Sequence, residues 1–358
     1  MWGFSIQGAK MKKYIILILT IVCTCLIWMG CSNSVSSDED ANTSWVFVAN
    51  EGISYSSDEN DNVPGSISMI DENNNITNIE NIGKTVQSLE VYNNKLFVIV
   101  TDDHKIITYN IDSDGITFED EILTNSSMPR EMVIINDKIY FTNLETQDIK
   151  IFDIINNKLE ESTISINGRP EDIIFDGTYI WVSIPEISKW DFNYGTKVAK
   201  IDPIFNEIIE YIEVGRGPQN LISYNNTIYI SRTFYDSDWN PFYGSSKIGT
   251  EKVINNYGSG GGACGGSVMV YNEDIYRSFE GGIAPLKDNL EIDNLNRIGS
   301  YTQDQVYQVE IINDNIWFCI TNWTNLNLVK VVNNNGQEIA SYNVGIGPGD
   351  LAYWKKSE

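Results

Sequence analysis

The stretch LEVYNNKLFV, at residues 89–98, is the pattern that most of this 358-residue chain repeats. Two runs of alternating apolar residues flank an Asn-Asn pair, and Asn tolerates the positive φ of a two-residue hairpin turn. Further copies are MVIINDKIYF from Met132, IIFDGTYIWV from Ile173, LISYNNTIYI from Leu221, VMVYNEDIYR from Val268 and VEIINDNIWF from Val309. The turns begin at Asn93, Asn136, Asp176, Asn225, Asn272 and Asn313, so they lie 40 to 49 residues apart. A period of about 40–45 residues with four strands per unit is typical of a β-propeller blade.

The two ends of the repeat region complement each other. VGIGPGDLAYW from Val344 supplies a strand with no partner after it, and WVFVANEG from Trp45 lacks a strand before it. Pairing these segments completes a seventh blade and covers both sheet edges. The alternative is six blades with one large insertion, because residues 258–299 are the least regular. The segment from Gly281, however, aligns with that from Gly65 and is predicted to supply a third and a fourth strand.

We therefore predict an all-β fold, a seven-bladed β-propeller of four-stranded blades closed by the C-terminal strand. A two-sheet sandwich would not require the repeat. The propeller is expected over residues 45–354, with a short tail at 355–358. The formal net charge of −25 argues against a nucleic-acid partner, since phosphate binding needs a basic surface. The one histidine, His104, argues against hydrolases and lyases that use imidazoles, and we predict that the protein is not an enzyme.

The N-terminal residues have the layout of an export signal. Two lysines precede an apolar run of about 15 residues, which is shorter than a spanning helix needs. The pair Gly30-Cys31 resembles the lipobox of bacterial lipoproteins, in which the cysteine is lipidated, although Trp28 and Met29 depart from the usual pattern. We interpret residues 1–31 as a signal peptide and 32–44 as a flexible polar tether. An uncleaved anchor helix is the alternative. The expected location is the cell envelope, at the outer membrane or cell surface.

Two further cysteines, Cys264 and Cys319, would remain after export. In an oxidising compartment they can form a disulfide, but the sequence does not show that they are close. Two separate thiols are the alternative. Cys264 lies in the Gly-rich stretch at 258–266, which lacks the Lys-Ser/Thr ending of a phosphate-binding loop.

Three loops that join a second strand to a third are long, at residues 51–65, 184–196 and 232–246. In a propeller such loops gather on one face around the central channel, and long loops often carry function. Their aromatic residues stand among polar ones, which suits flat ligands with polar edges such as sugars or corrinoids. Packing of the loops against one another is the alternative. The candidate ligand-binding residues are Tyr55, Trp190, Phe192, Tyr194, Arg232, Tyr235, Trp239, Phe242 and Tyr243.

The mouth of the channel is a second candidate site. One polar residue stands near the start of each innermost strand: Ser88, Glu131, Glu171, Asn220, Ser267, Gln308 and Asp350. Such a ring can bind a cation or ligand hydroxyls, and a lining for a water-filled channel is the simpler interpretation. No cofactor is expected. Residues 58–62 (DENDN) offer the oxygen donors that Ca²⁺ prefers, without the EF-hand spacing.

By these features the chain resembles the YVTN/YncE-type bacterial seven-bladed propellers over about residues 45–354. The resemblance rests on Gly-x-x-Pro-like entries to the first strand, as in VGRGPQN from Val214, and on third strands that end in Ile-Asp, as in SISMID from Ser66. Surface lipoproteins of similar build bind cobalamin beside an outer-membrane transporter, which implies a corrinoid-like ligand and such a transporter as partner. No residue matches a diagnostic cobalamin motif, and likeness of fold is not evidence of function.

The leading hypothesis is a lipid-anchored binding protein that captures a small molecule or glycan on its loop-rich face. A protein-interaction scaffold of the envelope would instead present a broad face without a pocket. A metal-centred hydrolase or lyase would need Glu131, Glu171 and Asp350 to hold a divalent metal.

Overall fold

The computed structural model describes residues 43–54, 61–189, 194–238, 240–259 and 266–356. These residues belong to one compact unit, Thr43–Lys356. Several positions singled out in the sequence lie outside the described residues: the signal region, nearly all of the tether, Cys31, Tyr55, Trp190, Phe192, Trp239, Cys264 and most of the DENDN segment.

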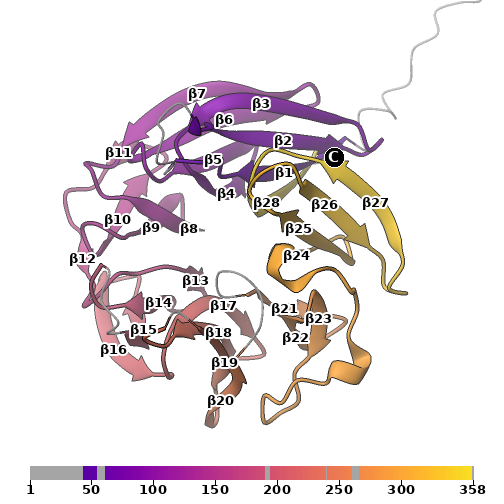
Figure 1. Ribbon diagram of the computed structural model, residues 1–358. Helices are drawn as coiled ribbons and strands as arrows, with labels where there is room; N and C mark the ends of the chain where they lie inside the picture. Colours follow the sequence, from indigo (N-terminus) through magenta and orange to yellow (C-terminus); the bar gives the residue numbers. More distant parts are fainter. Residues whose placement is uncertain (1–42, 55–60, 190–193, 239, 260–265, 357–358) are drawn as a thin grey trace, which may run out of the picture. The chain divides into compact units, whose positions relative to one another are not determined.

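Seven antiparallel sheets are arranged in a ring within this unit, which confirms the predicted seven-bladed β-propeller (Figure 1). The innermost strands are β4 (Val86–Tyr92), β8 (Pro129–Ile135), β13 (Ile173–Phe175), β17 (Pro218–Tyr224), β21 (Val268–Tyr271), β24 (Val306–Ile312) and β28 (Pro348–Lys355). The second strands are β5 (Lys95–Val100), β9 (Lys138–Asn143), β14 (Ile180–Glu186), β18 (Thr227–Tyr235), β22 (Asp274–Phe279), β25 (Asn315–Thr321) and β1 (Ser44–Asn50).

The third and outer strands complete the sheets. The third strands are β6 (Lys105–Asp112), β10 (Asp148–Asp153), β15 (Tyr194–Asp202), β19 (Pro241–Ile248), β23 (Gly282–Pro285), β26 (Asn327–Val332) and β2 (Gly65–Asp71). The outer strands are β7 (Gly115–Leu123), β11 (Lys158–Leu159) with β12 (Ile164–Ser165), β16 (Glu207–Glu213), β20 (Lys252–Ser259), β27 (Glu338–Asn343) and β3 (Ile76–Gly83). Two 3-10 helices, η3 (Asn294–Asn296) and η4 (Gln303–Gln305), precede β24.

The chain ends close the ring as predicted. β28 pairs with β1 in antiparallel register, so that Trp45 lies opposite Trp354 and Phe47 opposite Ala352. β1 in turn pairs with β2, and the sheet order is β28-β1-β2-β3. The C-terminal strand is therefore the innermost strand of the N-terminal blade, and neither β1 edge is left open.

The hairpin turns have the backbone that their residues favour. Asn136 and Asp137 have φ of 50° and 61°, and Asn313 and Asp314 have φ of 49° and 60°. Positive φ at both central residues defines the type I′ turn, whose twist matches that of the flanking strands. The pairs Asn225-Asn226 and Asn272-Glu273 also have positive φ at both residues, so four of the repeated hairpins share this turn geometry.

The blade formed by β21, β22 and β23 has only three strands. The predicted third strand is present as β23, and the predicted fourth strand is absent. In place of the fourth strand, Ile298 forms an isolated bridge with Ile283 of β23. Asp293 caps the intervening η3 by accepting a hydrogen bond from the Leu295 N–H at 3.3 Å. The carbonyl of the buried Leu290 accepts from the Tyr257 hydroxyl at 2.6 Å, which holds this segment against the neighbouring blade.

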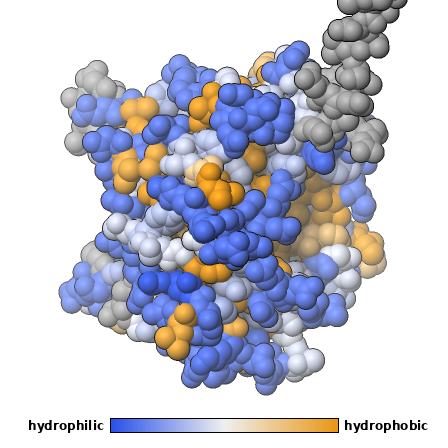
Figure 2. Space-filling model, turned by 90° about the vertical axis from the view of Figure 1, so that its right-hand side faces the viewer, coloured by the Kyte–Doolittle hydropathy of each residue, from blue (hydrophilic) through white to orange (hydrophobic). Residues whose placement is uncertain are grey.

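Apolar clusters lie between successive sheets. Phe47 and Ile67 of the closing blade, for example, share a buried cluster with Val98 and Ile107 of the next blade. Burying an aliphatic or Phe side chain stabilises the fold by about 1.5–3 kcal/mol, so these contacts hold the ring together. One side of the unit is mostly hydrophilic, with apolar residues in separate groups (Figure 2). Within residues 43–356, the described part contains no apolar helix of membrane-spanning length.

Candidate functional site

A cavity of about 820 Å³ lies where the innermost strands of all seven blades meet. It is lined by residues of these strands and by residues that follow second strands, such as Leu144 after β9 and Tyr235 at the end of β18. The cavity therefore reaches the face on which the second-to-third loops lie. Its size falls within the range of small-molecule pockets, about 300–1,000 Å³.

A β-bulge shapes several innermost strands beside the cavity. Register shifts occur between Val86 and Ser88, Pro129 and Met132, Pro218 and Leu221, and Val306 and Gln308. A bulge leaves one residue outside the ladder and redirects its side chain. The freed backbone N–H of Glu131 accordingly donates to Thr142 Oγ1 at 3.0 Å, and that of Asn220 donates to Ser231 Oγ at 3.2 Å.

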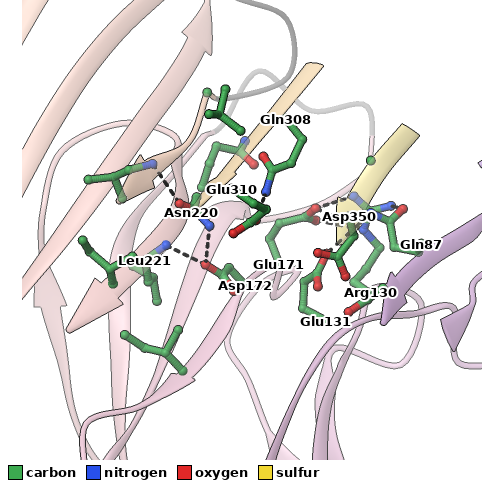
Figure 3. A pocket seen from close by; sticks show the side chains of 18 of the residues that line it. Gln87, Arg130, Glu131, Glu171, Asp172, Asn220, Leu221, Gln308, Glu310 and Asp350 are labelled. Carbon is green, nitrogen blue, oxygen red and sulfur yellow. Dashed lines mark hydrogen bonds and ion pairs between the residues drawn. The ribbon is translucent and has the colours of Figure 1, made fainter. Parts of the chain in front are cut away.

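Four polar side chains beside the cavity each connect one blade to the next. Each accepts a hydrogen bond from a backbone N–H of the following innermost strand: Asp350 from Leu89 at 2.6 Å, Asp172 from Leu221 at 2.6 Å, Asn220 from Val268 at 3.0 Å and Ser267 from Val309 at 3.0 Å. These bonds fix the orientation of the polar ring around the cavity (Figure 3). Part of the ring thus has a structural role in holding the blades in register.

Six of the seven residues predicted at the channel mouth line the cavity: Ser88, Glu131, Glu171, Asn220, Gln308 and Asp350. Ser267 is not a lining residue, although its neighbours Gly266 and Val268 are. In the blade that begins with β13, however, the residue equivalent to Glu131 is Asp172. Asp172 directly precedes Ile173, which pairs with Val182, whereas Glu171 lies five residues before its turn, as Glu131 does. Phe175 pairs with Ile180, so this hairpin has a four-residue turn, whereas the β8–β9 hairpin has a two-residue turn. Counting back from the start of the turn therefore gives a position one residue too early in the chain.

Glu171 instead forms an ion pair with Arg130. Arg130 Nε donates to Glu171 Oε1 at 3.1 Å and to Oε2 at 3.2 Å, and Nη2 also donates to Oε1. Arg130 Nη1 donates to Gln87 Oε1, and the amide nitrogen of Gln87 lies 3.5 Å from Glu131 Oε1. A chain of polar contacts therefore crosses from β4 through β8 to Glu171, two residues before β13 (Figure 3).

Two further carboxylates line the cavity: Glu90, which follows Leu89 in β4, and Glu310, which follows Val309 in β24. Burial raises the pKa of Glu90 to about 7 and that of Glu310 to about 7. The pKa of Asp172 is raised to about 7 by burial, which outweighs the hydrogen bonds from Leu221 and Ile173. Burial and neighbouring carboxylates raise the pKa values of Glu131 and Asp350 well above their ordinary range.

A second cavity, of about 420 Å³, adjoins the first, since Arg130 and Leu144 line both. Its walls include Glu51, Asp102 and the partly exposed indole of Trp323. The Tyr307 hydroxyl donates to Glu51 Oε1 at 2.5 Å, and the Tyr307 ring meets Trp323 edge to face at 5.0 Å. Burial raises the pKa of Glu51. An aromatic ring beside two carboxylates suits a cation or a polyhydroxylated ring.

The described residues of the aromatic loops lie in different surroundings. Tyr235 lines the central cavity. Phe242 stacks on Phe234 with ring centres 5.7 Å apart, and Tyr243 is buried. Arg232 is also buried; its Nη2 donates to the Asn255 carbonyl at 2.7 Å and its Nη1 to the Arg216 carbonyl at 3.2 Å. Tyr194 begins β15. The loops therefore contain packed residues and one that reaches the cavity.

The remaining chemically active side chains lie within the framework. His104 Nδ1 accepts the backbone N–H of Met128 at 3.0 Å, in a turn after β5. Cys319 is buried in β25, and burial raises the pKa of its thiol. Among the described residues, no three His, Cys, Asp or Glu side chains converge as a metal-binding group.

Neither a protein-family model nor a curated protein sequence matches this chain. Solved structures match its fold. AztD from Citrobacter koseri is 12% identical, with 89% of this chain and 100% of that chain covered and a TM-score of 0.53. A protein of unknown function from Desulfotomaculum acetoxidans is 11% identical, with 87% and 99% covered and a TM-score of 0.62. Virginiamycin B lyase from Staphylococcus aureus is 15% identical, with 74% and 87% covered and a TM-score of 0.52. At these identities the likeness establishes the propeller fold alone.

Proposed function

We propose that this protein is a lipid-anchored, extracytoplasmic binding protein that takes a small molecule into the central cavity at its loop-rich face. The observation that carries the proposal is the polar cavity of about 820 Å³ to which all seven blades contribute. Inter-blade hydrogen bonds hold its walls in place before a ligand arrives, so little ordering is required on binding. The described residues that line the cavity offer many hydrogen-bonding groups, which suits the binding of a polar ligand.

The test is a ligand screen with and without a blocked cavity. Gln219 lines the cavity and its side chain makes no hydrogen bond to another described residue, so Gln219→Trp should fill the space with little loss of stability. Thermal shifts of the full-length protein against glycans, corrinoids, amines and organic acids should reveal a stabilising ligand. That shift should be lost in Gln219→Trp and kept in Glu207→Trp, which changes an exposed residue of the outer strand β16. A stabilising ligand that acts equally on both variants would place binding elsewhere.

The anchor is tested separately. In cells fed a fatty-acid analogue, the wild-type chain should be labelled and a Cys31→Ser variant should not be, because the lipid of a lipoprotein is carried by the cysteine of the lipobox. Fractionation of the same cells should find the wild type in the membrane fraction and Cys31→Ser outside it. Equal labelling of the two chains would exclude Cys31 as the attachment point.

A further inference from the structure

The central cavity contains more carboxylates than cations, and this bears on the class of ligand that the proposed function requires. Two arginines line it, and each already has a partner: Arg130 pairs with Glu171, and Arg169 Nε donates to Glu186 Oε2 at 3.0 Å. The other lining carboxylates form no ion pair with any described lysine or arginine. They are Glu90, Glu131, Asp172, Glu310 and Asp350.

These carboxylates differ in the hydrogen bonds that they accept. Asp172 and Asp350 accept backbone N–H groups on both oxygens, so they are committed to holding the blades together. Glu310 accepts one side-chain hydrogen bond, from Gln308 at 2.7 Å. Glu131 accepts from the Ser88 side chain and lies at the long distance of 3.5 Å from the Gln87 amide nitrogen, which leaves it with acceptor positions to spare. Glu90 accepts no hydrogen bond from a described residue. Glu90, Glu131 and Glu310 therefore have lone pairs available to a ligand.

A different kind of group also lacks a partner here. Thr233 of β18 lines the cavity and is only 3% exposed, and its hydroxyl has no hydrogen-bond partner among the described residues. Buried hydroxyls are seldom left in this state, because the loss of hydration is not compensated. A ligand that donates N–H groups would satisfy both Thr233 Oγ1 and the free carboxylate oxygens.

We propose that the ligand of the central cavity is an organic cation with more than one ammonium group, such as a linear polyamine. The three available glutamates stand on β4, β8 and β24 of three different blades, so a ligand with several ammonium groups can pair with more than one of them. Figure 3 shows Glu131 grouped with Arg130 and Asp350. The charges of Glu310 and Glu90 also raise the pKa of Asp350, so negative charge from several blades is concentrated in the cavity. The adjoining cavity adds Trp323, Glu51 and Asp102, an aromatic and acidic wall suited to a further ammonium group. The net charge of −25 attracts cations to the mouth.

The proposal implies that binding depends on pH. Burial favours the protonated carboxyls in the empty cavity, and an ammonium ion favours the ionised form, so protons leave as the ligand binds. Affinity should therefore rise as the pH is raised from 6 to 8. The charged groups that line the two adjoining cavities are Glu51, Glu90, Asp102, Arg130, Glu131, Arg169, Glu171, Asp172, Glu186, Glu310 and Asp350. Arg130 and Arg169 are the cations that oppose the ligand, and Glu171 and Glu186 offset their charges.

Opposite changes in charge at neighbouring residues test the ligand class. Calorimetric titration of the full-length protein would use spermidine as the cation, citrate as the anion and maltotriose as the neutral probe. Spermidine should bind with a stoichiometry of one, about tenfold more weakly to Glu131→Gln and several-fold more tightly to Arg130→Gln. Glu207→Gln removes an exposed carboxylate of β16 and should leave the affinity unchanged, while Gln219→Trp should abolish binding. Thermal melts identify any variant that has failed to fold.

The outcomes separate this proposal from the proposed function. Binding of citrate that Arg130→Gln abolishes, or of maltotriose independently of pH, would overturn the cation while leaving a small-molecule site intact. Spermidine binding that Glu207→Gln weakens as much as Glu131→Gln would show general attraction to an acidic surface, and would also overturn it. If spermidine does not bind but the wider screen finds a ligand that Gln219→Trp excludes, the proposed ligand class is wrong and the proposed binding function is supported. If the wider screen finds no ligand either, both the ligand class and the binding function are contradicted.

Discussion

Truncation of the chain after Asn343, which removes β28, is expected to abolish the cooperative unfolding transition of the propeller. β28 is the innermost strand of the closing blade and pairs with β1 along its whole length. Its loss would expose the edge of β1 and remove Leu351, Ala352 and Trp354, all buried. The buried Leu and Trp side chains alone contribute roughly 4–5 kcal/mol. The lost ladder and the Asp350–Leu89 bond add to this, against a total stability of about 5–15 kcal/mol.

Circular dichroism melts and size-exclusion chromatography would measure the effect. The truncated chain should melt gradually and elute as aggregates, because an exposed strand edge pairs with other chains. Two matched controls bracket the result. Truncation after Lys356 removes no residue of β28 and should leave the transition intact, and Trp354→Ala should lower the melting temperature while keeping it cooperative. A sharp transition near the wild-type temperature without β28 would show that the six complete blades suffice.

The blade count could be predicted from the sequence because each blade repeats one hairpin with its own turn residues. Asn136-Asp137 and Asn313-Asp314 specify type I′ turns through local chemistry, which needs no knowledge of the rest of the fold. The missing outer strand after β23 depends instead on packing. Leu290 is buried against the neighbouring blade, and its partner Tyr257 lies 33 residues away in the sequence. Such contacts between distant segments are invisible in a local pattern.

The candidate site could be predicted in part. The repeat located the channel mouth, but counting from the turn placed Glu171 where the structure has Asp172, since that turn is longer. Glu90 and Glu310 were missed, although a signal existed. The same position is apolar in the other copies, for example Val133, Ile174 and Ile222, and an acidic residue there breaks the pattern. Arg130 could not be recognised, because its importance comes from contacts with Gln87 and Glu171 on other strands.

Raising the pH from 5 to 8 is expected to lower the stability of the ligand-free protein. Burial raises the pKa of Glu90 and of Glu310 from 4.5 to about 7, and that of Asp172 from 3.8 to about 7. A carboxyl whose pKa is higher in the folded state binds its proton more tightly there. Its contribution to stability is therefore complete below its unfolded pKa, near 4, and is lost as the pH rises through 7. Each such group corresponds to roughly 3 kcal/mol.

Thermal melts in buffers matched for ionic strength would measure this change, which should be a fall in melting temperature on the order of 10 °C between pH 5 and 8. The melting temperature of the variant Glu90→Gln/Glu310→Gln should fall by less over this pH range, because the two introduced amides have no proton to lose. Glu207→Gln/Glu210→Gln, on exposed positions of β16, should fall like the wild type. An equal slope in all three proteins would assign the effect to the acidic surface as a whole. An ammonium ligand compensates only ionised carboxylates, so spermidine should raise the melting temperature of the wild type at pH 8 and have little effect at pH 5. In the variant Glu90→Gln/Glu310→Gln, this difference between the two pH values should be lost.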